Sequence, residues 1–486
     1  MRFRRASTRW YTYAAALAVV LPLAAATAAS AGASPPKQAP RGLEPRVVDV
    51  TNDQALIFGE PEVAVNPEHP DNLVYVATKI GDTPACQLSG NANCQLTPTI
   101  FGPQPAGLIN DVPGFSPNEI AVSFNRGRTW RSVTVPTLPA PVPDTGFLMG
   151  GDPAIAAGPH GTFYFSEDVV NFQTGLPPQA PTIARDAGIA VSTSQDGGLT
   201  WSTPVLSGTP ADRDFMTVDA STGTVYLESG AGPLGPASTA NPNAPSSTLA
   251  GRWLVASNDG VHWSAPAFLG VGISGPFISA ARGVFATGGR STSPALCGTA
   301  PACEVFQTTR DAGETWAQHA VPNSSDSSDG LLVAADPTRP GHFTVAFLNA
   351  AATQLVVHQT RDAGNTWSGP TTVSEDATKT QWKPWLAYSP DGTLGLMWRT
   401  WQGTPNSSPY NVWAAFSRDG GATFTQPLEV SDGDSPAPFP HPFPTFADDF
   451  SFIALGRHEA YVAWADWRPG ARQGFLSLIR LRELEH

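Results

Sequence analysis

The sequence predicts an all-β protein folded as a seven-bladed β-propeller. A short turn motif, Ser/Thr-x-Asp/Asn-x-Gly-x-Thr-Trp/Phe, occurs six times between residues 123 and 424, although the third copy, Ser257–Trp263, is one residue short. The same order of four short apolar runs surrounds each copy, and four antiparallel strands make one propeller blade. The chain is also rich in Gly (46), Pro (48), Phe (24) and Trp (14), which is typical of many tight turns between short strands and not of a disordered chain.

The first 33 residues have the pattern of a secretory signal peptide. An apolar run from Ala14 to Ala26 follows a positive segment and precedes small residues up to Ala33; the positive charges are Arg2, Arg4, Arg5 and Arg9. The run is shorter than a bilayer span, so we expect a secreted, extracellular protein and no membrane anchor. A Pro-rich linker over residues 34–45 and one propeller domain over residues 46–486 follow. The formal net charge of −13 disfavours nucleic acid as a partner.

The four cysteines form two close pairs along the chain. Cys86 is near Cys94, and Cys297 is near Cys303. An exported protein enters an oxidising compartment, so we expect two local disulfides, one within each pair. A zinc site is the alternative, but the spacings do not fit one and no histidine flanks the pairs.

The turn motif has a structural explanation at each of its recurring positions. Its acidic or amide side chain can accept backbone N–H bonds within a tight turn, and its Gly supplies a positive φ. The final aromatic ring can anchor the turn on a hydrophobic layer. We therefore interpret the six motif residues as structural and not catalytic; they are Asn125, Asp196, Asp259, Asp311, Asp362 and Asp419.

The first strands of the repeats outnumber the motifs by one. They begin near Glu60, Asp152, Asp214, Pro276, Asp329, Lys383 and Asp448. The last unit has neither a motif nor a fourth strand, and an unassigned strand exists at Arg46–Val50. If this N-terminal strand completes the last unit, it closes the ring and leaves no sheet edge exposed. Seven blades are therefore preferred, with six as the alternative.

The repeated turns resemble the Asp boxes of the sialidase superfamily and of secreted bacterial neuraminidase-repeat proteins. Glu60–Pro67, Asn72–Val76 and Trp464–Arg468 are also similar to segments of those proteins. The resemblance implies a propeller and a sialidase-like glycoside hydrolase acting on extracellular glycans. The Arg-Ile-Pro motif of true sialidases is absent, and their Tyr–Glu pair matches no motif here. Other Asp-box propellers are endoglucanases, polysaccharide lyases or binding proteins.

The order of strands assigns the Asp boxes to one rim of the ring, which we call the Asp-box rim. The first strands begin at the opposite rim, where the loops between second and third strands also lie; we call it the loop rim. These loops are long, and long loops in compact repeats are usually functional. We therefore expect the functional site at the loop rim.

Charged residues at the starts of first strands and the ends of second strands form the candidate site. We expect general acid and base chemistry from four carboxyl groups, Asp152, Asp214, Glu228 and Glu167. We expect substrate binding by a cluster that grips a carboxylate and by an aromatic ring; these residues are Arg290, Arg399, Arg468, Arg213 and Trp401. The alternative is that the arginines and carboxylates pair with one another structurally.

These observations favour a glycoside hydrolase related to sialidases, acting as a monomer on a terminal or anionic sugar of an extracellular glycan or glycoconjugate. A non-catalytic propeller that binds glycan or protein, or a lyase acting on uronic-acid polymers, is the alternative. No cofactor or metal is expected. A Ca²⁺ ion in an acidic funnel is the alternative, although no EF-hand-like loop supports it.

Overall fold

The structure is a computed structural model that describes residues 44–54, 56–80, 118–136, 138, 145–173, 183–210, 213–230, 251–270, 278–325, 327, 330–405, 407–436, 448 and 450–481. The expected signal peptide at residues 1–33 and most of the expected linker lie outside these residues. Cys86 and Cys94 lie outside them as well. Within the described residues, no helix is both long enough and apolar enough to span a membrane.

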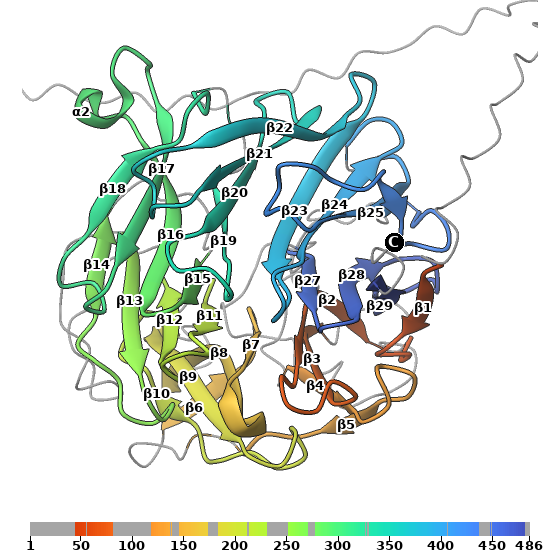
Figure 1. The fold of residues 1–486 in the computed structure, drawn as a ribbon. Helices are drawn as coiled ribbons and strands as arrows, with labels where there is room; N and C mark the ends of the chain where they lie inside the picture. The colour runs from red at the N-terminus through yellow and green to blue at the C-terminus, as the bar shows by residue number, and fades with distance from the viewer. Residues whose placement is uncertain are drawn as a thin grey trace, which may run out of the picture. The chain divides into compact units, whose positions relative to one another are not determined.

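The described residues form seven antiparallel sheets that follow one another around a ring (Figure 1), as the sequence predicts. Blade I contains β2 (Ile57–Val65), β3 (Leu73–Ile80), β4 (Glu119–Ser123) and β5 (Arg131–Val133). Blade II contains β6 (Thr145–Met149), β7 (Ala154–Ala157), β8 (Phe163–Gln173), β9 (Ile183–Ser194) and β10 (Val205–Leu206). Blade III contains β11 (Phe215–Val218), β12 (Val225–Ser229), β13 (Arg252–Ser257) and β14 (Ala267–Gly270).

The remaining blades repeat the same order. Blade IV contains β15 (Ile278–Ala281), β16 (Val284–Ser291), β17 (Cys303–Thr309) and β18 (Ala317–Ala320). Blade V contains β19 (Leu332–Ala335), β20 (Phe343–Leu348), β21 (Gln354–Thr360) and β22 (Ser368–Glu375). Blade VI contains β23 (Thr380–Tyr388), β24 (Leu394–Trp401), β25 (Tyr410–Ser417) and β26 (Leu428–Glu429). Two short helical turns, η2 (Pro159–Gly161) and α2 (Pro294–Cys297), lie in connections.

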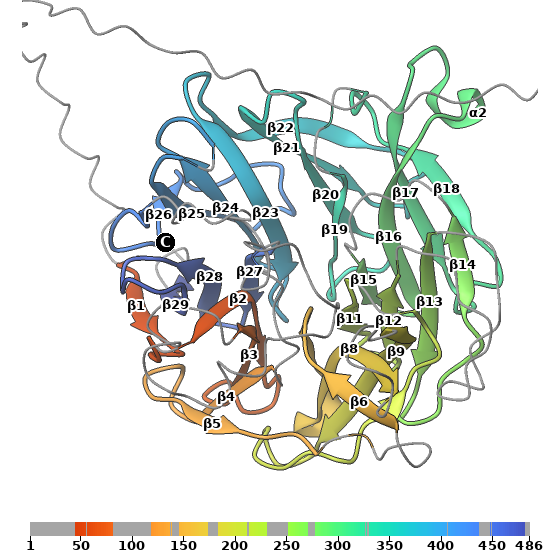
Figure 2. The same cartoon turned by 180° about the vertical axis from the view of Figure 1, so that it is seen from behind.

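Blade VII is closed by the N-terminal strand, which confirms the predicted closure. It contains β27 (Phe452–Leu455), β28 (Glu459–Asp466) and β29 (Gln473–Arg480), and β1 (Arg46–Asp49) is its fourth strand. The two end segments pair antiparallel, with Arg46 opposite Leu478 and Asp49 opposite Phe475. β1 lies beside β29 from either side of the ring (Figure 2). Pairing the two ends of the domain removes a free edge from the last sheet.

Blade II differs from the expected four strands. β8 and β9 extend toward the loop rim, and β6 pairs with the extension, placing Met149 opposite Val169. The inner strand β7 pairs with the earlier part of β8. The link between β6 and β7 contains Gly150, Gly151 and Asp152, all at positive φ. An additional strand therefore borders the start of the inner strand where Asp152 lies.

Each Asp box turns the chain between the third and fourth strands and packs on the preceding blade. In blade II, Asp196 accepts hydrogen bonds from the backbone N–H and the hydroxyl of Thr200, at 2.9 and 2.6 Å. Gly198 has a φ of +93°, and a Cβ added to it would lie 2.6 Å from Val74 of blade I. The motif side chain likewise accepts a backbone N–H in the other boxes, at Asn125, Asp259, Asp311, Asp362 and Asp419.

The hydrophobic core fills the space between neighbouring sheets. Between blades VI and VII, for example, Leu396 and Trp398 share a buried cluster with Val462 and Trp464. Both tryptophans are almost fully buried. Since the apolar layers lie between blades, the strand ends and loops at the two rims are left to carry polar groups.

Candidate functional site

The inner strands enclose a cavity of about 660 Å³ on the Asp-box side of an aromatic group. Phe215 of β11 stacks on Trp385 of β23 with ring centroids 5.4 Å apart, and Phe450 contacts Phe215 edge-on at 4.9 Å. Phe215 and Trp385 also line the cavity, which is otherwise bordered mainly by small and apolar residues of the inner strands and first turns. The polar groups of the candidate site lie at the strand starts, on the loop rim.

Four inner strands have, at or near their starts, a residue in the left-handed backbone region. The φ angles are +48° at Glu60, +35° at Asp152, +53° at Arg213 and +47° at Lys383. Glu60, Asp152 and Lys383 each precede a proline, and the register of pairing shifts at this point in blades I and VI. Positive φ is unfavourable for residues other than glycine, and such conformations concentrate at functional sites. The repeated conformation therefore marks the loop-rim mouth of the ring.

Three carboxyl groups of blades I to III, Glu62, Asp152 and Asp214, form what we call the acidic cluster. Asp214 interacts electrostatically with each of the other two. Asp214 is 2% exposed, and its Oδ2 accepts a hydrogen bond from the Ser166 hydroxyl. Its Oδ1 has no hydrogen-bond partner among the described residues. Asp152 is only partly buried, and its Oδ2 accepts the backbone N–H of Arg213 at 2.7 Å.

Burial gives two members of the acidic cluster an unusually high affinity for protons. It raises the pKa of Asp214 well above its ordinary value, and the nearby Asp152 carboxylate acts in the same direction against the Ser166 hydrogen bond. Burial also raises the pKa of Glu62, a shift opposed by the N–H of Ile155 at 3.1 Å and reinforced by Asp214. A carboxyl that keeps its proton near neutral pH can donate it, which is the requirement for a general acid.

The other two predicted carboxyl groups are also buried at the loop-rim ends of blades II and III. Burial raises the pKa of Glu167 to about 8, although Asn118 donates a hydrogen bond to it at 3.2 Å. Burial raises the pKa of Glu228 as well, while Arg252 opposes the shift through a 2.9 Å ion pair. Arg252 also donates to the backbone carbonyl of Arg213 at 2.5 Å. Glu228 is therefore part of a buried structural pair that supports the start of blade III.

The structure gives Arg399 a carboxylate partner inside the ring. Arg399 is fully buried and donates to both carboxylate oxygens of Asp448, at 2.9 and 3.0 Å, and to the hydroxyl of Ser451 at 2.6 Å. Burial disfavours the charge of Asp448, but Arg399, Lys383 and Arg472 together lower its pKa. Arg399 is thus enclosed and engaged by the protein itself, so it does not face a ligand.

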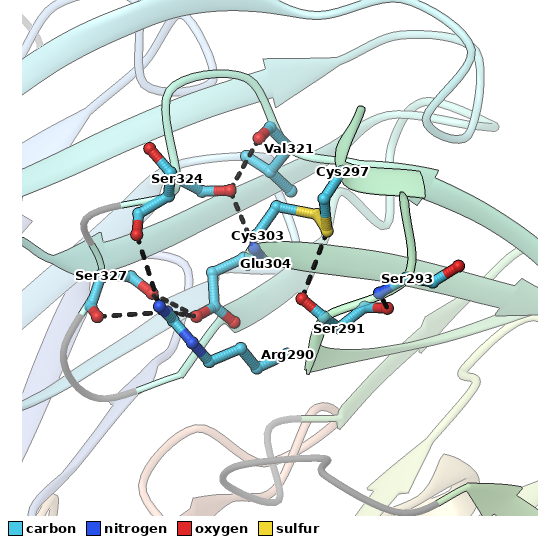
Figure 3. The surroundings of a disulfide bond; sticks show 10 residues. Arg290, Ser291, Ser293, Cys297, Cys303, Glu304, Val321, Ser324 and Ser327 are labelled. Carbon is cyan, nitrogen blue, oxygen red and sulfur yellow. Dashed lines mark hydrogen bonds and ion pairs between the residues drawn. A yellow bond between two sulfur atoms is a disulfide. The ribbon is translucent and has the colours of Figure 1, made fainter. Parts of the chain in front are cut away.

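Arg290 and Arg468 are less buried than Arg399 but are also paired. Arg290 donates to Glu304 at 3.0 Å and contacts Ser327, as Figure 3 shows. Arg468 forms a 2.9 Å ion pair with Asp466 and a second one with Asp432. The pairing matches the structural alternative for these residues, because a shared grip on one ligand would require donors that these carboxylates occupy.

The last predicted arginine, Arg213, contributes through its backbone at the acidic cluster. Its N–H donates to Asp152, and its carbonyl accepts from Arg252. Its side chain is exposed. Arg213 therefore holds the start of blade III against blade II, and its positive φ places it at the mouth of the ring.

The predicted aromatic residue, Trp401, is inside the protein and 2% exposed. Its ring stacks on Trp382 at 4.5 Å, and the cationic groups of Lys383 and Arg399 lie over the Trp382 ring. Trp401 therefore supports this corner of blade VI and offers no open face to a sugar.

Sequence reasoning missed several residues that organise the candidate site. Ser166, Asn118 and Arg252 each contact a predicted carboxyl group, and Glu62 belongs to the acidic cluster. A charged residue before proline recurs near the starts of three first strands, at Glu60, Asp152 and Lys383, and this recurrence could have indicated the mouth of the ring. Ser166 and Asn118 had no comparable signal, because their contacts join different blades or segments distant along the chain.

One of the two expected disulfides forms in the described part of the chain. The bridge between Cys297 and Cys303 joins the end of α2 to the start of β17 (Figure 3). Cys303 lies opposite Ser291 in the sheet, so the bridge holds the loop next to Arg290.

The other expected disulfide, between Cys86 and Cys94, involves residues that the structure does not describe, so it stays a prediction. Among the described residues, no group of three or more His, Cys, Asp or Glu residues is placed to hold a metal ion.

No protein-family model matches the chain, and no curated protein matches it. Among solved structures, a protein of unknown function from Dyadobacter fermentans aligns over 90% of this chain and 99% of its own, with 15% identity and a TM-score of 0.47. A sialidase from Trypanosoma rangeli aligns over 92% of this chain and 61% of its own, with 10% identity and a TM-score of 0.42. An α-L-arabinanase from Penicillium chrysogenum aligns over 72% and 98%, with 15% identity and a TM-score of 0.39. At these values the likeness carries no argument about activity.

Proposed function

We propose that the protein is an extracellular glycoside hydrolase whose reacting groups lie in the acidic cluster on the loop rim. The observation that carries the proposal is the interaction between two unlike carboxyl groups, the buried Asp214 with its raised pKa and the partly exposed Asp152. Glycosidases use two carboxyl groups, one of which donates a proton to the leaving oxygen while the other serves as base or nucleophile.

The environment of each carboxyl group assigns its role. Burial raises the pKa of Asp214, its Oδ2 accepts the Ser166 hydroxyl, and its Oδ1 has no hydrogen-bond partner among the described residues, so Oδ1 is the atom proposed to donate a proton to a glycosidic oxygen. Asp152 itself has a strained φ of +35°, and its carboxylate accepts the backbone N–H of Arg213. Together these fix its side chain at the mouth of the ring. Asp152 is thus the group proposed to act as base or nucleophile.

The position of the site and its charges bear on which sugar it would accept. A terminal sugar suits a site at the mouth of a closed ring, and a sialidase-like preference would require cationic groups for the sugar carboxylate. Arg399 is enclosed by its own partners, so this preference would depend on groups other than a triad of Arg290, Arg399 and Arg468. A neutral terminal sugar is therefore the substrate class that the described residues favour.

The test is turnover of fluorogenic glycosides, sialosides and arabinofuranosides among them, by the wild-type protein and by two matched variants. Asp214→Asn removes the proton donor, and we expect kcat to fall by about 10² to 10⁴-fold. Asp219→Asn is the control because this buried residue lies at the other end of β11. Its hydrogen bonds go to the turns of blades III and IV and not to the acidic cluster, so its kcat should stay near wild type.

Two results would contradict the proposal. One is equal turnover by the wild-type protein and Asp214→Asn. The other is the absence of turnover on every glycoside while glycans bind to the wild-type protein, which would favour the non-catalytic binding function.

A further inference from the structure

A cavity of about 490 Å³ lies on the Asp-box rim, between blades IV and V. One side is formed by the box and fourth strand of blade IV, with Arg310 and His319. The other side is formed by the first turn and the box of blade V, with Gly341 and Arg361. The cavity is on the rim opposite the acidic cluster, so it is separate from the proposed active site.

Both arginines occupy the second position of an Asp box. Blades IV, V and VI carry Arg310, Arg361 and Arg418 there, whereas the first three boxes carry Phe124, Gln195 and Asn258. The boxes of blades IV, V and VI share one residue spacing and two consecutive residues at positive φ, so this position recurs on the Asp-box rim in those three blades. Neighbouring boxes therefore bring Arg310 and Arg361 to one cavity in a chain with a net charge of −13.

Arg310 and Arg361 are exposed, and within the described residues neither makes an ion pair or a side-chain hydrogen bond. This distinguishes them from Arg252, Arg290 and Arg399, each of which has a carboxylate partner. The guanidinium groups bordering the cavity thus retain their donors for a ligand.

The one carboxylate bordering the cavity in the described residues, that of Asp362, is occupied by its own turn. Its Oδ1 accepts the hydroxyl of Thr360 at 2.9 Å and the N–H of Thr366 at 2.8 Å, and its Oδ2 accepts the hydroxyl of Thr366 at 2.6 Å. These bonds lower the pKa of Asp362 and hold it in the turn, where it does not pair with either arginine.

The walls of the cavity are fixed by packing between the two blades. The N–H of Ala363 donates to the carbonyl of Gly341 at 2.9 Å, which ties the box of blade V to the first turn of that blade. A Cβ added to Gly364 would lie 2.8 Å from the ring of His319, so the box backbone rests against this imidazole. The two arginines therefore project from turns that packing holds in place.

We propose that this cavity is a binding site for a tetrahedral oxyanion, a phosphate or sulfate group. The planar guanidinium forks of Arg310 and Arg361 match the geometry of such an anion, and His319 supplies a further polar group on the same wall. The inference stands independently of the proposed hydrolase activity, since the two sites share no residue.

The test is calorimetric titration of the full-length mature protein with inorganic phosphate and, separately, with inorganic sulfate, at constant ionic strength set with sodium chloride. We expect Arg310→Ala and Arg361→Ala each to weaken binding by about tenfold or more, because each removes charge-assisted hydrogen bonds. Arg418→Ala is the matched control, since Arg418 has the same box position but does not border the cavity. Its affinity should equal that of the wild-type protein.

The two anions identify the source of the ligand group. Binding of phosphate alone assigns the site to phosphorylated ligands, and binding of sulfate alone or more tightly assigns it to sulfated ones. The proposal is overturned if neither anion gives heat beyond that of chloride, or if Arg418→Ala weakens binding as much as the cavity variants do. Thermal unfolding of each variant checks that exposed arginine replacement leaves the fold intact.

Discussion

The motif carboxylates of the Asp boxes differ from two carboxyl groups of the loop rim, Glu167 and Asp214, in exposure and in hydrogen bonding. Each motif carboxylate accepts several hydrogen bonds from its own turn; Thr315 and Thr309 lower the pKa of Asp311 to about 2. Glu167 and Asp214 are buried with few donors, and burial raises the pKa of Glu167 to about 8. The difference shows that a recurring acidic motif marks carboxylates that are already satisfied, whereas the groups suited to proton transfer have no motif of their own.

The rims also differ in how their arginines are used. On the loop rim Arg399 is enclosed and fully paired with Asp448, so it belongs to the interior of the ring. On the Asp-box rim Arg361 is exposed and forms no ion pair with the described residues. Arg399 therefore stabilises the mouth of the propeller, whereas Arg361 keeps its guanidinium donors free of carboxylate partners among the described residues.

The largest expected effect comes from breaking the buried pair on the loop rim. Arg399→Met leaves Asp448 buried without its main partner, and we expect a loss of about 3–5 kcal/mol in the free energy of unfolding. Arg361→Met, at an exposed site, should stay within about 0.5 kcal/mol of the wild-type protein. Urea unfolding measures both. Equal midpoints for Arg399→Met and the wild-type protein would contradict the structural role of this pair, and Asp448→Asn added to Arg399→Met should recover part of the loss.

The next effect is a stability difference that depends on pH and has opposite signs at the two rims. Glu167 has a pKa near 8 in the folded protein and 4.5 as its ordinary value, so its contribution is complete below pH 4.5 and is lost as pH rises through 8. Each difference of one in pKa corresponds to about 1.4 kcal/mol. Glu167→Gln should therefore flatten the decline of the unfolding free energy between pH 4.5 and about pH 8.

The Asp-box side of this comparison is tested at Asp196. Slight burial disfavours its charge, but hydrogen bonds from Thr200 and Ser194 outweigh that cost and lower its pKa. Its contribution is present above its ordinary pKa of 3.8 and is lost as pH falls through the folded value. Asp196→Asn should thus reduce the loss of stability in acid and leave the alkaline side unchanged. Urea unfolding over the whole pH range measures both variants. The comparison would be contradicted if Asp196→Asn changed the pH dependence of the unfolding free energy on the alkaline side.

The smallest expected effect separates two reasons why a position requires glycine, a positive φ and the lack of space for a Cβ atom. Gly198 and Gly283 have φ angles of +93° and +75°, so alanine is strained by about 1–2 kcal/mol at either position. A Cβ at Gly198 would in addition lie 2.6 Å from Val74, whereas Gly283 faces open space. Gly198→Ala should therefore cost about 1–3 kcal/mol more than Gly283→Ala. Thermal unfolding checks the difference, and equal melting temperatures would show that the box does not press on the preceding blade.

The fold was predictable from the chain because its signals are local and repeated. Turn residues at fixed offsets and short apolar runs specify each blade, and the surplus strand at Arg46–Val50 specifies how the ring closes. The fifth strand of blade II was not predicted, since β6 pairs with an extension of β8 that has no turn signal of its own. The bridge between Cys297 and Cys303 was predictable because its two residues are near neighbours in sequence.

The sequence by itself determined the seven repeats, the two rims and the rim on which each charged residue lies, because a strand's direction follows from its place in the repeat. Only the tertiary structure decided which charges meet. Glu62, Asp152 and Asp214 come from three different blades. Arg399 of blade VI pairs with Asp448 of blade VII, and Arg310 and Arg361, from neighbouring blades, border one cavity. Contacts between blades depend on how the sheets turn around the ring and on which side chains are buried there, and neither is encoded in a local pattern.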